Sequence, residues 1–216
     1  MSGLFEEYEL DLGKETRWHI VSATVAAKSS FLYMQECGHY IAGPGYYTGR
    51  EGFDSFLMML TLSGGGEVDY DGKLWKLSPG SICWLDCRKR MKYFTDPSTA
   101  SWDFLWVHFY GGNVRALYEH FLKRNNNRPE THPENVLAIR NSLQDLIELD
   151  NSGIHQFEND VRTQDILTRI LSQCILDVMD SHSSEDIPKI VTDIQAYIQL
   201  NYTGTARSSF WESIST

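Results

Sequence analysis

The sequence lacks the segments that carry a chain into or across a membrane. No apolar run approaches the roughly 20 residues that a spanning helix needs. The N-terminal segment MSGLFEEYELDLGKE is acidic and has neither a basic nor an apolar stretch, so it does not resemble a secretion signal. We therefore expect a cytoplasmic protein with no membrane partner.

Basic residues and cysteine pairs are also scarce. The chain has 19 lysines and arginines against 29 aspartates and glutamates, a formal net charge of −10, which opposes contact with a phosphate backbone. Its four cysteines include no CxxC pair, which indicates reduced thiols rather than a disulfide framework. The chain as given is therefore expected to bind nucleic acid poorly.

Motifs for catalysis are missing as well. The seven histidines include no HxH or HxxxH pair that would chelate a metal on a strand. There is no GxSxG, Walker loop or HExxH motif. Gly64-Gly65-Gly66 lacks the lysine and helix of a phosphate loop and instead predicts a tight bend between strands. We expect no metal, no cofactor and no enzymatic activity.

What the chain does contain, between residues 30 and 110, is a series of short β-rich runs separated by turn residues. Asp71-Gly72 is typical of a tight hairpin, because glycine tolerates a positive φ, and Pro79-Gly80 marks a second turn. This spacing predicts a β-sandwich or a small barrel. The predicted strands are 31–35, 55–63, 67–70, 73–77, 81–85, 92–95 and 102–109.

Beyond residue 133 the apolar residues recur at intervals of three and four, the period of an amphipathic helix. Helices are predicted over 133–150 and 156–181, and a third over 188–202 precedes an irregular tail. The second helix carries an apolar seam that is long enough to cover a barrel and also meet a partner helix. The period alone leaves a second possibility open, in which the seam packs only on its own barrel. The seam consists of Leu167, Ile170, Leu171, Cys174, Ile175 and Val178.

The predicted strand at 102–109 has the most informative pattern. Alternation places Trp102, Phe104, Trp106 and His108 on one face of this strand. Buried indoles need polar partners, so a lumen lined by these side chains suits a ligand with an apolar face and hydroxyl edges, such as a sugar. The alternative for each of them is simple aromatic packing beneath the long helix.

A set of short motifs is spread over residues 30 to 204. It consists of Gly38-His39, Arg50, the strand 56–63 followed by Gly64, Leu77-Ser78-Pro79-Gly80-Ser81, Tyr93, and Trp102-x-x-x-Trp106-Val107-His108-Phe109-x-Gly111. The last pattern, together with the Pro-Gly turn before it, is the most specific. Taken together, these motifs resemble the AraC-type transcription regulators, in which an N-terminal cupin-like domain senses an effector and a C-terminal domain carries two helix-turn-helix units.

The resemblance implies an α+β fold: a cupin-like β-barrel (double-stranded β-helix or jelly roll) followed by a helical dimerisation segment. The implied domains are an effector-binding barrel at 1–132, the dimerisation segment at 133–182, and a linker with a truncated start of the DNA-binding domain at 183–216. The resemblance further implies a homodimer that binds a small-molecule effector, with a sugar expected, and that contacts DNA only through the missing C-terminal domain.

The expected ligand-binding residues are Tyr46, Thr48, Arg50, Tyr93, Trp102, Phe104, Trp106 and His108. Arg50 is expected to donate a bidentate pair of hydrogen bonds to sugar hydroxyls, and Trp106 to stack beneath the ring. Near Tyr46 and Phe104 the chain presents aromatic side chains where the arabinose-responsive member of the family presents polar ones. The same sugar is therefore not implied.

The expected mechanism is that an effector orders residues 1–28, or the loop 43–50, over the barrel and so changes how the barrel holds its neighbouring domains. Two subunits would pair through the seam of the helix 156–181. Two other interpretations remain open. A metal-dependent cupin enzyme predicts a bound metal, and a ligandless dimerisation module predicts a lumen filled by its own side chains.

Overall fold

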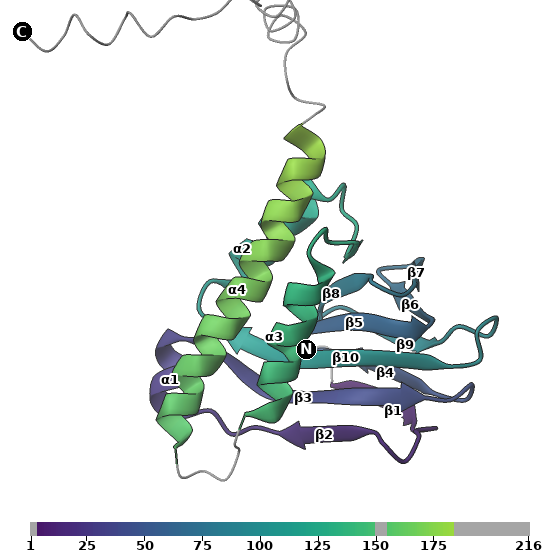
Figure 1. Cartoon of the computed structure of the whole chain (residues 1–216), viewed down its shortest axis with the longest axis horizontal. Coiled ribbons are helices and arrows are strands. Elements are labelled where there is room, and N and C mark those ends of the chain that lie inside the picture. Colours follow the sequence, from purple (N-terminus) through teal and green to yellow (C-terminus); the bar gives the residue numbers. More distant parts are fainter. Residues whose placement is uncertain (1–3, 150–154, 184–216) are drawn as a thin grey trace, which may run out of the picture. The chain divides into compact units, whose positions relative to one another are not determined.

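Two β-sheets form the body of the computed structural model, which describes residues 4–149 and 155–183 (Figure 1). One sheet has five strands in the order β1-β4-β9-β6-β7, and the other has six in the order β11-β8-β5-β10-β3-β2. The strands are β1 (Phe5–Glu9), β2 (Arg17–Ile20), β3 (Leu32–Ala42), β4 (Tyr47–Glu51), β5 (Phe56–Gly64), β6 (Gly66–Tyr70), β7 (Lys73–Leu77), β8 (Ile82–Asp86), β9 (Met91–Thr95), β10 (Trp102–Gly111) and β11 (Glu130–Thr131).

The strand pairs of both sheets are antiparallel. Each of the seven strands predicted from the sequence is present, and β3 is longer than the predicted 31–35. Asp71 and Gly72 have φ angles of 55° and 74°, as a primed hairpin turn between β6 and β7 requires. The architecture confirms the predicted α+β fold with a cupin-like barrel, and it adds β1, β2, β4 and β11, which the sequence patterns did not predict.

Within the described residues, four helices accompany the sheets: α1 (Val25–Ser30), α2 (Val114–Arg124), α3 (Val136–Glu148) and α4 (Gln156–Ser183). α3 and α4 confirm the two predicted helices. α3 begins later than the predicted residue 133, because Asn135 is the N-cap and its side chain accepts a hydrogen bond from the Ala138 N–H at 3.2 Å. The predicted third helix, the linker and the tail fall in 184–216, outside the described residues.

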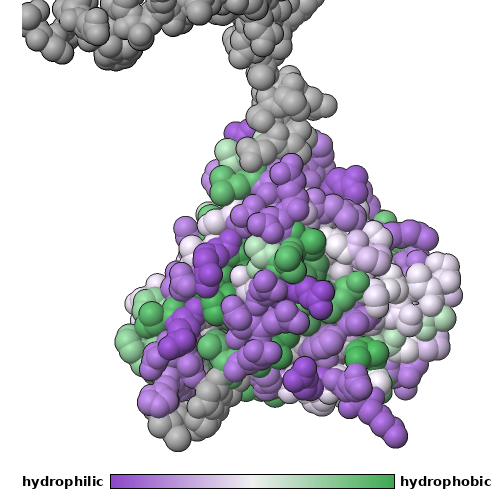
Figure 2. Space-filling view, in the orientation of Figure 1, coloured by the Kyte–Doolittle hydropathy of each residue, from purple (hydrophilic) through white to green (hydrophobic). Residues whose placement is uncertain are grey.

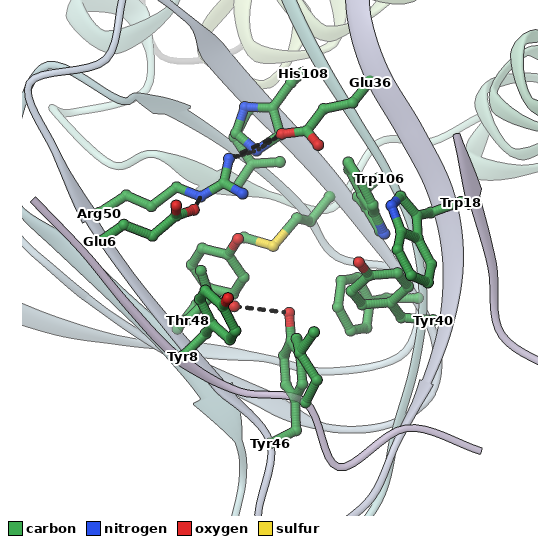
Figure 3. A pocket seen from close by; sticks show the side chains of 15 residues that line it. Glu6, Tyr8, Trp18, Glu36, Tyr40, Tyr46, Thr48, Arg50, Trp106 and His108 are labelled. Carbon is green, nitrogen blue, oxygen red and sulfur yellow. Dashed lines mark hydrogen bonds and ion pairs between the residues drawn. The ribbon is translucent and has the colours of Figure 1, made fainter. Parts of the chain in front are cut away.

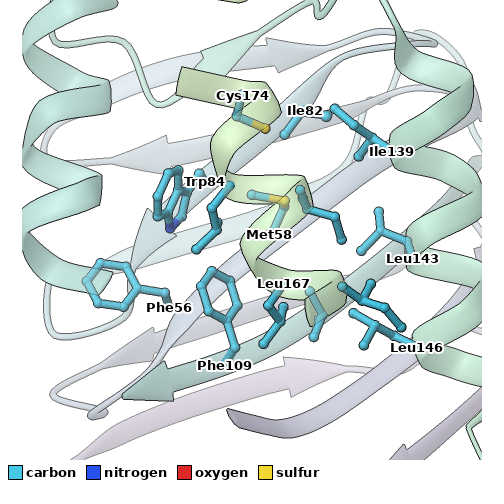
Figure 4. Packing of buried hydrophobic residues seen from close by; sticks show 14 of the residues in the cluster. Phe56, Met58, Ile82, Trp84, Phe109, Ile139, Leu143, Leu146, Leu167 and Cys174 are labelled. Carbon is cyan, nitrogen blue, oxygen red and sulfur yellow. The ribbon is translucent and has the colours of Figure 1, made fainter. Parts of the chain in front are cut away.

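One hydrophobic core lies between the outer face of the six-stranded sheet and the helices (Figure 4). Phe56, Trp84 and Phe109 of the sheet meet Leu143 of α3 and Leu167 of α4 in this cluster. Burial of one such side chain contributes about 1.5–3 kcal/mol to folding. The barrel and these helices thus share one core, and both belong to one compact unit that ends at Met179.

The packing of α4 corrects the assignment of its seam to a subunit interface. The predicted interface residues face the chain's own sheet and α3, and all but one of them are at most 2% exposed. They are Leu167, Ile170, Leu171, Cys174 and Val178, together with Ile175, which is partly buried against the same cluster. Side chains that are already covered in the single chain cannot also cover a partner while α4 stays on the sheet. The two possibilities left open by the helical period are therefore decided in favour of the barrel.

The helix-covered face is mostly hydrophilic and is interrupted by a few apolar side chains (Figure 2). The large apolar residues that are exposed on α3 and α4 are Leu137, Phe157, Val161, Leu176 and Met179. No helix within residues 4–149 and 155–183 is long and apolar enough to cross a membrane.

Candidate ligand-binding site

A cavity of about 150 Å³ lies within the barrel, and both sheets contribute to its wall (Figure 3). A single water needs about 10–15 Å³, so the cavity has room for a small organic molecule. Aromatic side chains make up about half of the lining, and a few charged and hydroxyl groups stand among them. The lining residues are Glu6, Tyr8, Leu10, Trp18, Glu36, Tyr40, Tyr46, Thr48, Arg50, Leu57, Met59, Tyr93, Phe104, Trp106 and His108.

Alternation along β10 places its side chains as predicted. Phe104, Trp106 and His108 line the cavity, whereas Leu105 and Val107 lie in the core beneath the helices. Gly38 of the neighbouring strand β3 lies opposite Trp106 in the register. A Cβ atom at Gly38 would lie 2.9 Å from Trp106 Cζ2 and 2.7 Å from Trp18 Cβ, so the absence of a side chain there makes room for both indoles.

The cavity is closed on one side by an N-terminal arm, which we define as residues 5–20 and which includes β1 and β2. Pairing of β1 with β4 places Glu6 opposite Arg50 and Tyr8 opposite Thr48, and all four side chains line the cavity. None of the β1 residues is fully buried. β1 therefore lies over the barrel as an edge strand that is held mainly by main-chain pairing.

Arg50 is the centre of a charged cluster in the cavity wall (Figure 3). Its Nη1 donates to Glu36 Oε1 at 2.9 Å, and its Nε lies 3.0 Å from Glu6 Oε1. The Arg50 side chain is only 18% exposed, and a buried charge of this kind needs such partners. Burial alone would lower the pKa of Arg50, but Tyr93, Glu36 and Glu6 together raise that pKa above its ordinary value.

His108 is held in one tautomer by the same cluster. Arg50 Nη1 lies 3.0 Å from His108 Nε2, and because a guanidinium can only donate, Nε2 accepts. The proton therefore resides on Nδ1, which donates to Ser55 Oγ at 2.9 Å. Burial, together with the charge of Arg50, holds the pKa of His108 well below its ordinary value. His108 is thus a neutral imidazole.

The two indoles of β10 differ in whether their N–H group has a hydrogen-bond partner. Trp102 does not line the cavity: its ring stacks on Phe104 with centroids 3.9 Å apart, and its Nε1 donates to Thr61 Oγ1 at 3.1 Å. Trp106 does line the cavity, and its buried Nε1 has no hydrogen-bond partner within the described part of the chain. An unpartnered buried donor is costly unless a ligand or water supplies an acceptor.

Seven of the eight predicted site residues thus come together around one cavity. They are Tyr46, Thr48, Arg50, Tyr93, Phe104, Trp106 and His108. Sequence reasoning missed Glu6, Tyr8 and Leu10, because the first strand shows no hydrophobic alternation, and it missed Glu36 and Tyr40, because they lie past the end of the predicted strand 31–35. Leu57 and Met59 were missed, and so was Trp18, although a tryptophan directly after the polar run 13–17 was a usable signal.

The titratable phenols and thiols of the barrel interior remain protonated near neutral pH. Burial raises the pKa of Tyr93 to about 12 and that of Cys87 to about 12, and it raises the pKa of Tyr40 and Tyr46 as well. No group of three His, Cys, Asp or Glu side chains suited to a metal ion occurs among the described residues.

A family model for the AraC-like ligand binding domain matches residues 33–183, more than half of the chain. The chain belongs to this family. The AraC-like match covers β3 to α4 and so includes most of the cavity wall, while the N-terminal arm precedes it. A comparison with curated proteins gives no match.

Solved structures similar to this AraC-like chain are distant in sequence. YhaK from Escherichia coli is 10% identical, with 46% of each chain covered and a TM-score of 0.40. The Cupin_2 domain of an XRE family transcriptional regulator from Enterobacter cloacae is 14% identical over 51% of this chain and 100% of that one, with a TM-score of 0.35. An HTH_3 family transcriptional regulator from Vibrio cholerae is 13% identical over 47% and 57%, with a TM-score of 0.36.

Proposed function

We propose that this chain is the effector-sensing region of a transcription regulator and that it binds a sugar in the barrel cavity. The observation that carries the proposal is the cavity itself, in which aromatic faces stand beside hydroxyl and charged groups under the N-terminal arm. Membership of the AraC-like ligand binding domain family supports the same function. The role is binding rather than catalysis, and DNA would be contacted through a further domain.

The lining favours a ligand with an apolar face and hydroxyl edges. Tyr40 and Trp106 meet edge to face, with centroids 5.0 Å apart and planes at 74°, and Tyr40 meets Tyr46 in the same manner at 5.9 Å. Such rings present both flat faces and edges to a sugar ring. The unpartnered Nε1 of Trp106 offers a hydrogen bond to a ligand oxygen. A ligandless module would instead have a lumen filled by its own side chains.

In this proposal the N-terminal arm couples ligand binding in the cavity to the rest of the regulator. Glu6 and Tyr8 reach the cavity from β1, so a ligand that contacts them would favour the closed position of the arm over an open one. Because β1 buries none of its side chains completely, a modest ligand contribution suffices to shift this equilibrium. The arm would then report occupancy of the cavity to the rest of the regulator, which we place in the cytoplasm.

We also propose that the regulator is a homodimer. The seam of α4 is buried, so pairing through this helix would use its exposed apolar residues, which include Val161 and Leu176 at 44% and 53% exposure. Light scattering of the chain and of a Leu176→Glu variant tests this part. A dimer that becomes a monomer in the variant supports it, and a monomeric wild-type chain contradicts it.

Thermal unfolding with a panel of neutral sugars at millimolar concentration tests the sensing function. A ligand at about 100 times its Kd adds about 2.7 kcal/mol, which raises Tm by roughly 5–10 °C for a chain of this size. We expect one sugar to raise Tm, with the effect lost in Trp106→Ala and kept in Trp75→Ala, a tryptophan of β7 outside the cavity lining. No effect from any sugar would contradict the proposal.

A further inference from the structure

The charged groups of the cavity do not balance. Arg50 is the one cationic side chain in the lining, and it faces the carboxylates of both Glu6 and Glu36, at 3.0 and 2.9 Å. His108 is neutral because burial holds its pKa well below the ordinary value. Burial raises the pKa of Tyr40, Tyr46 and Tyr93, so these phenols are neutral as well. Two carboxylates against one guanidinium leave one negative charge in excess.

The two carboxylates belong to different parts of the barrel. Glu36 is part of β3 and is 23% exposed, so it is a fixed element of the barrel wall. Glu6 is part of the arm and is 38% exposed. A ligand anion that paired with Arg50 would have to displace Glu6, and with it the arm, and would still lie beside Glu36. Like charges at such short range in a partly buried site strongly disfavour the complex.

The hydrogen-bonding groups restrict the ligand further. Trp106 Nε1 can only donate and has no partner within the described residues, while the carboxylates of Glu6 and Glu36 can only accept. A ligand carboxylate brings acceptors alone, and a ligand ammonium brings donors alone. A hydroxyl brings both, so a ligand that bears hydroxyl groups satisfies the indole and the carboxylates together.

We propose that Glu6 and Glu36 set the charge class of the effector: together they exceed the charge of Arg50 by one, so that the cavity excludes carboxylates and phosphates and admits uncharged, hydroxyl-bearing molecules. This inference rests on the proposed function in that a ligand enters the cavity. It assigns to Glu6 a second role beside closure of the arm, because the same side chain blocks the guanidinium that an anion would seek.

The test compares acetate with its uncharged counterpart acetamide by saturation-transfer NMR titration of the whole chain. Glu6→Gln/Glu36→Gln retains the shape of both side chains and removes both charges, which leaves Arg50 free for an anion. We expect the wild-type chain to bind acetate at least tenfold more weakly than the double variant, with acetamide binding changed less than threefold. Glu36→Gln alone is the fallback if the double variant does not fold, and it should gain acetate affinity in the same direction.

Glu7→Gln is the matched control. It removes the same charge from the same strand, but Glu7 points away from the cavity and pairs with Lys92 at 3.2 Å. This variant should leave acetate affinity unchanged. Equal acetate affinity in the wild-type chain and both Glu36 variants would overturn the inference, as would an equal gain in Glu7→Gln.

The outcome is separate from that of the sugar panel. A gain of acetate binding without any sugar binding would support the charge rule and contradict the proposed sugar. Sugar binding together with unchanged acetate affinity would support the proposed sugar and contradict the charge rule.

Discussion

Glu6 of the arm lies directly opposite Arg50 of β4 in the strand register, and its Oε1 is 3.0 Å from the Arg50 Nε. This pair joins a strand with no fully buried residue to the arginine that also contacts Glu36 and His108 in the cavity wall. Closure of the arm and completion of the binding site are therefore the same structural event, and changes that loosen the arm should also weaken ligand binding.

Asp11 is a second anchor of the arm. Its Oδ2 accepts a hydrogen bond from the Gly45 N–H at 2.9 Å, and its carbonyl accepts one from the Gly43 N–H at 2.8 Å. Asp11→Ala removes the side-chain bond and should weaken closure by about 1 kcal/mol. Limited proteolysis should then cut residues 5–20 several times faster. Asp69→Ala, which removes an exposed carboxylate from β6, should leave the cleavage rate unchanged, and equal rates in all three chains would contradict the anchoring role.

His108 makes the stability of the barrel depend on pH. Its pKa in the folded chain is well below 6.5 because the ring is buried beside Arg50. Below pH 6.5 the unfolded chain therefore binds a proton that the folded chain does not, and stability rises with pH up to about 6.5 and is fully present above it.

In the window between the two pKa values, His108 should lower the free energy of unfolding by about 1.4 kcal/mol for each pH unit of acidification. Denaturant unfolding at pH 7.5, 6.0 and 5.0 measures this. His108→Gln should show a shallower loss over the same window. An identical slope in the wild-type chain and the variant would mean that His108 is not the group responsible.

A substitution at Leu171 tests whether the seam of α4 belongs to the chain's own core or to a subunit interface. It is 1% exposed in the chain's own core, so Leu171→Glu should cost at least about 3 kcal/mol, because it buries an unpaired charge among apolar side chains. We expect loss of the folded state in circular dichroism rather than a folded monomer. Leu176→Glu, on the exposed side of the same helix, should keep its folded stability within about 0.5 kcal/mol. A folded, monomeric Leu171→Glu variant would contradict the core assignment and indicate that the seam forms a subunit interface.

The sequence predicted the elements whose pattern is local. The side chains of β10 alternate between the two faces from Phe104 to Phe109, so those of Trp106 and Val107 could be placed on opposite faces from the sequence alone. β5 reads as an unbroken apolar run, and the structure gives the reason: Met58 faces the helices while Met59 faces the cavity, so both faces of the strand are buried.

Other parts depend on long-range pairing that no local pattern records. β1 has a polar, exposed sequence because it is a lid with one side in solvent, so neither its strand conformation nor the approach of Glu6 to Arg50 could be predicted. Glu36 was missed for a related reason, since its role arises only where β3 passes Arg50. The period of α4 placed Leu171 on an apolar face correctly, but a period does not say what covers that face.

The most direct test of the central claim is a calorimetric titration of the whole chain with the sugar that raises Tm, repeated with Trp106→Phe and Trp75→Phe. Trp106→Phe keeps an aromatic ring but removes the unpartnered N–H in the cavity wall, a loss of about 0.5–1.5 kcal/mol, which weakens binding up to about tenfold. We predict one site per chain, a raised Kd in Trp106→Phe, and the wild-type Kd in Trp75→Phe. The same Kd in all three chains would show that the sugar binds elsewhere and would contradict the account.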